Sequence, residues 1–596
     1  MHATLRRPFV RGRFVALAIA LVWLASGTHG FTAPASDDSG TRKLDAHLRQ
    51  AIDRDGDDLA ERVIVQVEAG AADSVEAALK SRGEKPLRYH PGIGAFTVRS
   101  KHLLALAKHP GVKSISIDAP LEALQIAPLA VLTTEQIVRD SVSISGTWTG
   151  AGVGVALIDS GIEPSVDFTG RISAFYDFTR GGIATAPFDD YGHGTHVAGL
   201  IGGSGVLSNG AYAGLAPDVK FVVLKALNST GGGYTSDVIS AIEFATANRA
   251  ALGIDVMNLS LGHPPFESAS TDPLVRAVEA AVRAGIVVVA SAGNYGRNAT
   301  TNEIGYGGIA SPGNAPSALT VGSFMTEDTL RRSDDRMNGF SSRGPSYFDA
   351  FAKPDIVAPG YKLIANAAKQ STLYNTYPSL RVSGTSGGDY MMLSGTSMAA
   401  GVTSGVVAQL IQANRSTNLT RALPPNAIKA VLQHTALRLH DDTGAEYDAM
   451  TQGAGALNGA GAINFARGVK NATAVASSWL DAALSPDPGS STIDGETVVW
   501  GNTVVWGNTV VWGNTIGINQ AAWANTVVWG NTVVWGNTVV WGNNVVTDNT
   551  VVWGNTVVWG NAVLEGNTVV WGNNDLSGAT ASNAVLGSNT LINAVR

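Results

Sequence analysis

The chain of 596 residues contains no cysteine. This absence excludes disulfide bonds, thiol nucleophiles and zinc sites that use cysteine ligands. Charged residues make up only 15% of the sequence, and the formal net charge is −7. An average protein has roughly 25% charged residues. Because nucleic-acid-binding proteins carry basic patches, we expect no nucleic-acid partner.

Long hydrophobic runs are also lacking. The apolar run near the N-terminus extends from about residue 14 to residue 25, which falls short of the roughly 20 residues that span a bilayer. Arginines precede this run and small residues follow it, as is typical of a secretory signal peptide. We therefore predict a signal peptide at residues 1–30 and a secreted, extracellular or cell-surface protein.

Strand-like and helix-like segments alternate in residues 58–124, from RVIVQVEAG to VKSISIDAP. The predicted order is strand, helix, two strands, helix and strand. This order is typical of a small α+β domain of the ferredoxin-like type.

Residues 133–476 contain four apolar runs, GVGVALID, VKFVVLKAL, GIDVMNLSL and GIVVVASAG. Their β-branched residues point to both faces, which is typical of strands buried in a parallel sheet. Helix-like segments such as TSDVISAIEFATANRA lie between them. The sequence therefore predicts an α/β domain, with a mainly parallel sheet and helices on both faces.

The C-terminal part of the chain is repetitive. A polar stretch at residues 484–496 is predicted to be a linker. In residues 497–596 the hexapeptide TVVWGN occurs nine times. This repetition predicts a β-rich repeat region. The hexapeptide fits both a hairpin with a Gly-Asn turn and a β-solenoid with stacked Val and Trp. One unit, TIGINQAAWAN, is a residue short of two hexapeptides and favours a loop or corner.

Three candidate catalytic residues lie next to predicted strands and helices. Asp159 ends GVGVALID, His193 begins HGTHVAGL, and Ser397 begins a long helix-like run within SGTSMAAGVTSGVVAQLI. Functional groups gather at the carboxyl ends of strands in such sheets. The spacing of His193 and His196 would also suit a metal pair, but no cysteine or third histidine lies nearby in the sequence, so we expect a structural role for His196.

These segments resemble the subtilisin-like serine peptidases, or subtilases. The motifs VALIDSGI, HGTHVAG, SAGN, FSSRGP, KPDIVAPG and GTSMA occur in that family's order. The resemblance implies a triad of Asp159, His193 and Ser397, in which the imidazole takes the serine proton and the carboxylate orients the imidazole. It also implies that Asn294 and the Ser397 backbone N–H form an oxyanion hole.

The resemblance also implies how a substrate binds. Ser260, Leu261 and Gly262 match the strand that pairs with the peptide backbone. Ala310 matches a small residue at the floor of the pocket for the residue before the scissile bond. His263 stands where the family usually has a second glycine, so we expect a narrower or more polar rim.

Further expectations concern maturation and ions. The resemblance implies that residues 58–124 are an inhibitory propeptide, with self-cleavage between Asp118 and Glu135. It implies no organic cofactor; structural calcium is common in the family, but the sequence identifies no metal ligands. Gly401 departs from the family's GTSMAxP pattern, and we expect altered rigidity at that helix start.

We therefore predict a secreted serine endopeptidase that is made as a prepro-form and processes itself. It would hydrolyse peptide bonds through an acyl-enzyme intermediate, with proteins or peptides as substrates and its own propeptide as inhibitor. The alternative is a surface adhesion or self-assembly protein. In that case the Trp repeats would bind a cell surface, glycans or other copies of the chain, and the protease would only process.

Overall fold

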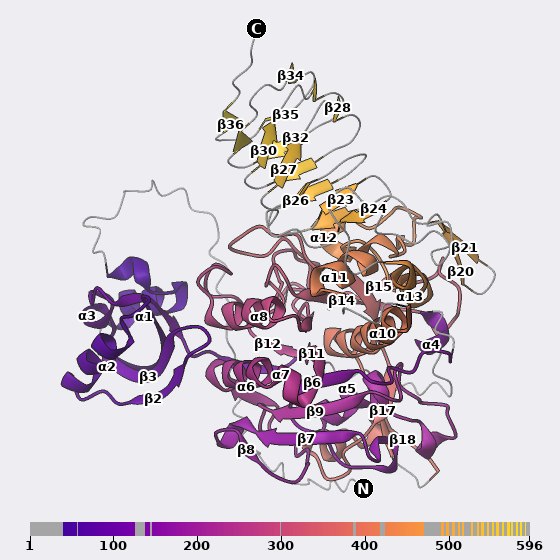
Figure 1. Cartoon of the computed structure of the whole chain (residues 1–596), viewed down its shortest axis with the longest axis horizontal. Coiled ribbons are helices and arrows are strands. Elements are labelled where there is room, and N and C mark those ends of the chain that lie inside the picture. The colour runs from indigo at the N-terminus through magenta and orange to yellow at the C-terminus, as the bar shows by residue number, and fades with distance from the viewer. Residues whose placement is uncertain are drawn as a thin grey trace, which may run out of the picture. The chain divides into compact units, whose positions relative to one another are not determined.

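The computed structural model (Figure 1) describes residues 40–56, 58–125, 138–142, 146–298, 300–385, 389–417 and 423–469, and the backbone of strands between residues 490 and 591. The predicted signal peptide at residues 1–30 lies outside the described residues. Within the part of the chain that is described, no helix has the length and hydrophobicity to cross a bilayer.

A nine-stranded sheet is the centre of the predicted peptidase domain. Its order is β15-β14-β13-β11-β6-β9-β7-β8, and β16 pairs with β14. The strands from β14 to β7 are parallel, and only the short edge strands β8 and β15 are antiparallel. The mainly parallel sheet is thus confirmed. The strands are β6 Gly154–Asp159, β7 Ile172–Asp177, β8 Ile183–Ala184, β9 Lys220–Lys225, β11 Ile254–Leu259, β13 Val287–Ser291, β14 Leu319–Met325, β15 Arg336–Met337 and β16 Ile356–Pro359.

The connections of this sheet lead to both sides of β6. From β6 the chain passes to β7 and β8 and returns through α5 to β9, whereas the connections through α6 and α8 lead to β11 and β13 on the other side of β6. Helix α5 packs against α10, whereas α6 packs against α8. A crevice opens at the carboxyl ends of the strands where the direction reverses, and Asp159 ends β6 there. The main helices are α5 His193–Gly202, α6 Thr235–Ala247, α8 Pro273–Arg283, α10 Thr396–Thr417 and α13 Gly459–Gly468.

The N-terminal unit is a four-stranded antiparallel sheet in the order β2-β3-β1-β4. Its elements follow the chain as strand, helix, two strands, helix and strand after a first helix, α1. Their bounds are α1 Ala46–Asp55, β1 Asp58–Val67, α2 Ala72–Ser81, β2 Pro86–His90, β3 Ala95–His102, α3 Leu103–Ala107 and β4 Val112–Ile117.

Helix α1 corrects the prediction that this unit begins at residue 58. The Asp45 carboxylate accepts a hydrogen bond from the Leu48 backbone N–H at 2.7 Å and caps the helix. Leu44 and Leu48 are buried in the same core as Val63 and Leu79. The polar composition of this stretch concealed an apolar face with helical spacing.

A small sheet joins the N-terminal unit to the peptidase domain. β5 (Pro120–Ala123) lies between β10 (Gly232–Tyr234) and β12 (Leu261–Gly262), antiparallel to both. Further short elements are α4 Val138–Ser141, α7 Arg249–Leu252, β17 Leu363–Asn366, α9 Thr372–Thr376, β18 Arg381–Val382, β19 Tyr390–Leu393, α11 Pro425–His434 and α12 Ala449–Gln452.

The repeat region forms parallel ladders between strands one coil apart. Val534 pairs with Val552 and Thr538 with Thr556, a separation of 18 residues or three hexapeptides. This pairing is that of a β-solenoid, and the hairpin alternative applies at β23–β24, where the irregular unit begins. The ladders contain β22 Val504–Trp506, β23 Val510–Trp512, β24 Thr515–Gly517, β25 Thr526–Val527, β26 Val533–Trp535, β27 Thr538–Trp541, β28 Val545–Val546, β29 Val551–Trp553, β30 Thr556–Trp559, β31 Val563–Leu564, β32 Val569–Trp571, β33 Asn574–Asp575, β34 Thr580–Ala581, β35 Val585–Leu586 and β36 Thr590–Leu591.

The predicted linker at residues 484–496 is partly wrong. β20 (Ser490–Ile493) pairs antiparallel with β21 (Glu496–Val499), so its second half belongs to a hairpin. The intervening Asp-Gly pair is a strong hairpin signal.

Substitution of two glycines of α10 by alanine should change the stability of the protein in opposite directions. A methyl group at Gly401 would meet Val197 and Leu200 at 3.4–3.5 Å, which is ordinary contact, whereas at Gly405 it would lie 2.6 Å from the Leu215 Cβ. We expect Gly401→Ala to raise the free energy of unfolding by about 0.5–1 kcal/mol, because alanine loses less backbone entropy in a helix. Gly405→Ala should lower it. Thermal unfolding of both variants checks this, and a loss of stability in Gly401→Ala would contradict it.

Candidate functional site

Asp159 and His193 form a buried pair at the carboxyl end of β6. Asp159 Oδ1 lies 2.7 Å from His193 Nδ1, and neither side chain is exposed. The Ser160 backbone N–H donates to the same Asp159 oxygen at 2.7 Å. His193 Nε2 has no hydrogen-bond partner among the described residues. The carboxylate therefore orients the ring and leaves Nε2 free to accept a proton.

A second buried carboxylate, Asp189, holds the start of α5. It accepts hydrogen bonds from the Gly192 and Thr195 backbone N–H groups at 2.8 Å, and from the Ser160 hydroxyl at 2.9 Å. The negative charge suits a helix N-terminus. Through Ser160, the segment after Asp159 is tied to the helix that begins with His193.

His196 lies one turn further along α5 and is fully buried. Its Nε2 donates toward the carbonyls of Leu363 and Met391, each at 3.1 Å. Burial, and secondarily the charge of His193, lowers the pKa of His196 to about 3. The ring is therefore neutral at physiological pH and links α5 to β17 and β19, in agreement with the predicted structural role.

Ser397 is the second residue of α10. Its Oγ donates to the Ser260 carbonyl at 2.9 Å, and its backbone N–H donates to the Leu124 carbonyl at 3.4 Å. A methyl group at Gly395 would lie 2.5 Å from that Leu124 oxygen and 3.4 Å from Asn294 Nδ2. Asn294 Nδ2 has no partner among the described residues. Two donors, the Ser397 N–H and the Asn294 amide, thus lie near one carbonyl oxygen.

The carbonyl belongs to a segment that lies in the site as an extended peptide. Leu261 pairs with Ala123 and Gly262 with Glu122, both in antiparallel register. On the other side of β5, Gly232 pairs with Glu122. The Leu124 backbone N–H donates to the Ser260 carbonyl at 3.4 Å. The strand predicted to bind substrate is therefore occupied by the chain's own residues.

The side chain of Leu124 lies beside Gly262 and Ala310, two of the residues predicted to bind substrate. A methyl group at Gly262 would contact Leu124 Cδ1 at 3.3 Å and Ala310 Cβ at 3.2 Å. Leu124 and Ala310 are both buried. The next residue, Gln125, donates from Nε2 to the Tyr191 hydroxyl at 2.5 Å.

His263, expected to make the pocket rim narrower or more polar, makes contacts on both its backbone and its ring. The His263 backbone N–H and carbonyl pair with Ser311 at 3.0 and 2.9 Å, and the ring stacks on Phe266 at 5.4 Å. His263 thus fixes β12 to the segment that contains Ala310.

The N-terminal unit also binds the start of α6. Asp118 accepts hydrogen bonds from the Ser236 backbone N–H and hydroxyl, both at 2.8 Å, and pairs with Arg62 at 2.5 Å. Arg62 also lies 4.0 Å above the Tyr234 ring. A carboxylate from one unit therefore caps a helix of the other.

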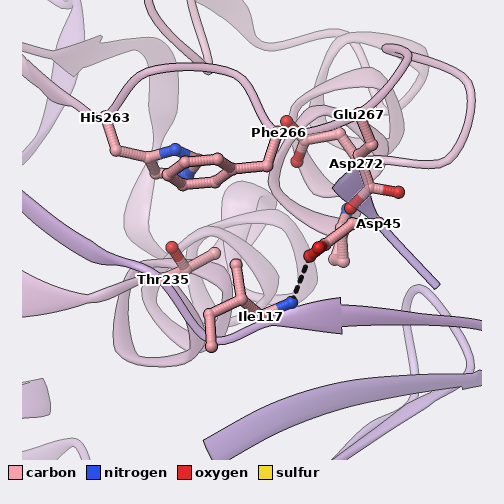
Figure 2. Close-up of a pocket in the computed structure, with 8 residues that line it drawn as sticks. Asp45, Ile117, Thr235, His263, Phe266, Glu267 and Asp272 are labelled. Carbon is pink, nitrogen blue, oxygen red and sulfur yellow. Dashed lines mark hydrogen bonds between the residues drawn. The ribbon is translucent and has the colours of Figure 1, made fainter. Parts of the chain in front are cut away.

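The N-terminal unit and the peptidase domain also meet at a pocket that is rich in carboxyl groups (Figure 2). Asp45 and Ile117 of the N-terminal unit line it together with His263, Phe266, Glu267 and Asp272. The Ala46 backbone N–H donates to the Phe266 carbonyl at 3.0 Å. Burial, and then the charge of Asp272, raises the pKa of Glu267 to about 8, and burial raises the pKa of Asp45.

Metal binding was expected without assigned ligands. Among the residues that the structure describes, no three His, Asp or Glu side chains converge in a way that could hold an ion. Structural calcium therefore stays an untested expectation, with no ligands assigned among the described residues.

Sequence reasoning missed the residues that support the pair Asp159 and His193. Asp189 and Lys225 are buried beside it, and their contacts join segments far apart in the chain. The available signal was the position of Lys225 at the end of an apolar strand, where a charge is unusual.

Comparison with known proteins now adds to this geometry. The sequence profile of the Subtilase family matches residues 150–462. The chain is 35% identical to "Serine protease AprX" of Bacillus subtilis (strain 168), over 59% of this chain and 74% of that protein. It is 34% identical to "Subtilisin E" of the same organism, over 55% of this chain and 72% of that protein.

A solved structure has the same fold. It is fervidolysin from Fervidobacterium pennivorans, described as a keratinolytic enzyme related to subtilisin, with a TM-score of 0.52 and 22% identity. The match covers 69% of this chain and 62% of that one. The adhesion alternative gains no support from these matches. The family profile and the two relatives confirm the predicted class of enzyme: the chain belongs to the subtilase family and is a subtilisin-like serine endopeptidase.

Proposed function

We propose that the protein is a secreted endopeptidase that is made as an inhibited precursor and cleaves its own chain between Leu124 and Gln125. The observation that carries this proposal is the contact of the Leu124 carbonyl with the Ser397 backbone N–H. That carbonyl precedes the Leu124–Gln125 peptide bond and lies where the negative oxygen of a tetrahedral intermediate would form.

Ser397, His193 and Asp159 would carry out the chemistry. Ser397 Oγ turns from the Ser260 carbonyl toward His193 Nε2, transfers its proton there and attacks the Leu124 carbonyl carbon. Asp159 stabilises the resulting imidazolium through Nδ1, and the Asn294 amide and Ser397 N–H stabilise the oxyanion. The protonated His193 then donates to the Gln125 nitrogen as the peptide bond breaks. Water hydrolyses the acyl-enzyme by the same proton transfers in reverse.

The same geometry suggests the substrates. Antiparallel pairing of β5 with β10 and β12 uses backbone groups, so any extended polypeptide segment of a protein can bind. The pocket holding Leu124 would select an apolar residue of medium size before the scissile bond. The N-terminal unit, residues 40–124, would act as the inhibitor until it is released.

Substitution of Ser397 tests the proposal directly. We expect the wild type to release a fragment whose last residue is Leu124, while Ser397→Ala stays intact because the nucleophile is missing. Intact mass and N-terminal sequencing of the purified chain measure both. Ser416→Ala is the control and should process normally, because the Ser416 hydroxyl lies at the far end of α10 and donates to the Ala413 carbonyl. Cleavage in Ser397→Ala would refute the triad.

A charge at Leu124 should slow self-cleavage. Leu124→Asp would bury a carboxylate in an apolar pocket, and we expect the first-order rate to fall by about 100-fold, since unpaired burial of a charge costs several kcal/mol. Glu122→Gln, two residues earlier and exposed, should leave the rate nearly unchanged. Time courses on denaturing gels give the rates, and equal rates for the two variants would show that another bond is cut.

Raising the pH should weaken binding of the cleaved N-terminal unit. Burial, and after it the charge of Asp272, raises the pKa of Glu267 to about 8, and the charge of Asp45 from this unit adds to the rise. Because release of the unit removes Asp45 and Ile117 from the pocket that they share with Glu267, we expect the docked state to hold the proton more tightly than the released state. Docking is therefore strongest below the ordinary glutamate pKa, weakens between about pH 4.5 and about pH 8, and changes little above that. The raised pKa values of Asp45 and Asp118 act in the same direction.

Size-exclusion chromatography of the processed protein at about pH 5 and about pH 8.5 measures this, on either side of the transition. We expect the cleaved unit to remain bound at the lower pH and to separate at the higher. Glu267→Gln should retain the unit better at high pH, whereas the exposed Glu303→Gln should behave as wild type. Stronger binding at high pH in the wild type would reverse the assigned sign.

A further inference from the structure

Lys225 is a fully buried cation beside the catalytic pair. It ends β9, and in the parallel ladder it lies directly opposite Asp159 at the end of β6. Its side chain is 2% exposed. A buried lysine is rare unless its charge is paired. The partners of the Lys225 ammonium group therefore indicate its role.

The ammonium group joins three segments around the site. Lys225 Nζ donates to the Ser160 carbonyl at 2.6 Å and to the Leu227 carbonyl at 2.7 Å, and it pairs with Asp190 Oδ1 at 2.6 Å. It also lies 5.0 Å from the centre of the Phe188 ring. All three donor positions of the ammonium are therefore used.

Two of these contacts lie close in sequence to a proposed catalytic residue. Ser160 follows Asp159, and Asp190 precedes His193 by three residues. The Asp159 carbonyl is itself held by the Ala226 backbone N–H at 2.8 Å, just after Lys225. A shift of Lys225 would thus move the segments that carry both members of the pair.

We propose that Lys225 is a positioning residue, which sets the distance between Asp159 and His193 by tying the segment after Asp159 to the segment before His193. It touches neither the substrate nor the reacting atoms. The inference rests on the proposed triad and extends it. Because misplacement by about 1 Å can cost 100-fold in rate, loss of this tie should reduce the chemical step rather than substrate binding.

The chain offers a matched control in Lys429 on α11. Its Nζ has the same set of partners, one carboxylate (Asp355, 2.8 Å) and two carbonyls (Pro316, 2.9 Å; Ala318, 3.0 Å). Ala318 precedes β14, so this cluster lies at the amino ends of the strands, opposite the edge with Asp159. Lys225→Met and Lys429→Met remove equivalent buried contacts, but only the first lies at the site.

The test uses the full chain and two rates. The first-order rate of self-cleavage reports chemistry, because the segment ending at Leu124 is already bound. Hydrolysis of an added peptide, PLEALQIA, by the processed enzyme separates kcat from KM. For Lys225→Met we expect both the self-cleavage rate and kcat to fall by about 10- to 100-fold, with KM changed by less than about threefold. Lys429→Met should keep both rates within about twofold, even if its thermal stability falls.

A double-mutant cycle with Asp190→Asn adds a second readout. If the ion pair transmits the effect, Asp190→Asn lowers kcat on its own and adds little to Lys225→Met. Equal losses of kcat in Lys225→Met and Lys429→Met, or an unchanged kcat in Lys225→Met, would overturn the proposal. If Lys225→Met does not fold, Asp190→Asn tests the proposal instead, because Asp190 is half-exposed. An unchanged kcat in Asp190→Asn would then overturn the positioning role of Lys225. An inactive wild type would instead contradict the proposed function, which Ser397→Ala tests separately.

Discussion

The site depends on burying carboxylates at the end of a parallel strand without leaving them unpaired. Asp159 is fully buried, and hydrogen bonds from the Ser160 N–H and from His193 to Oδ1 offset part of the cost of removing its charge from water. Each of these partners must in turn be held in place. Asp189 fixes the start of α5, and Lys225 pairs with Asp190 and donates to the Ser160 carbonyl next to Asp159. The requirement to satisfy one buried charge thus organises three loops.

The second organising feature is the pairing of β5 with strands on either side. Backbone hydrogen bonds hold this segment in an extended conformation, and the register brings Leu124 to Ser397. Side chains of the N-terminal unit add contacts that the strand alone does not supply, through Asp118 at α6 and Asp45 near Glu267. In the proposed function, inhibition, cleavage and release are successive states of this one interface. The proposal also makes release sensitive to pH, through the proton-binding groups of the interface.

Local sequence patterns predicted much of the secondary structure correctly. Runs of β-branched residues gave the strands of the central sheet, because a parallel sheet buries both faces of each strand. The same reasoning failed at α1, where polar residues concealed Leu44 and Leu48, and at residues 490–496, where a polar segment forms a hairpin. For the repeats, the hexapeptide period fitted two folds. Only the parallel ladders 18 residues apart distinguish the solenoid from a row of hairpins, since the two differ in long-range pairing.

The sequence by itself determined the family, the mainly parallel sheet and the candidate residues Asp159, His193, Ser397 and Asn294, because residue types in a fixed order carry that information. Only the tertiary structure decided which bond of the N-terminal segment lies at Ser397, since strand register is a long-range property. It also decided which partners His263 and Lys225 contact. These partners lie in distant segments, and neither burial nor the pairing of a charge can be read from the neighbours of a residue along the chain.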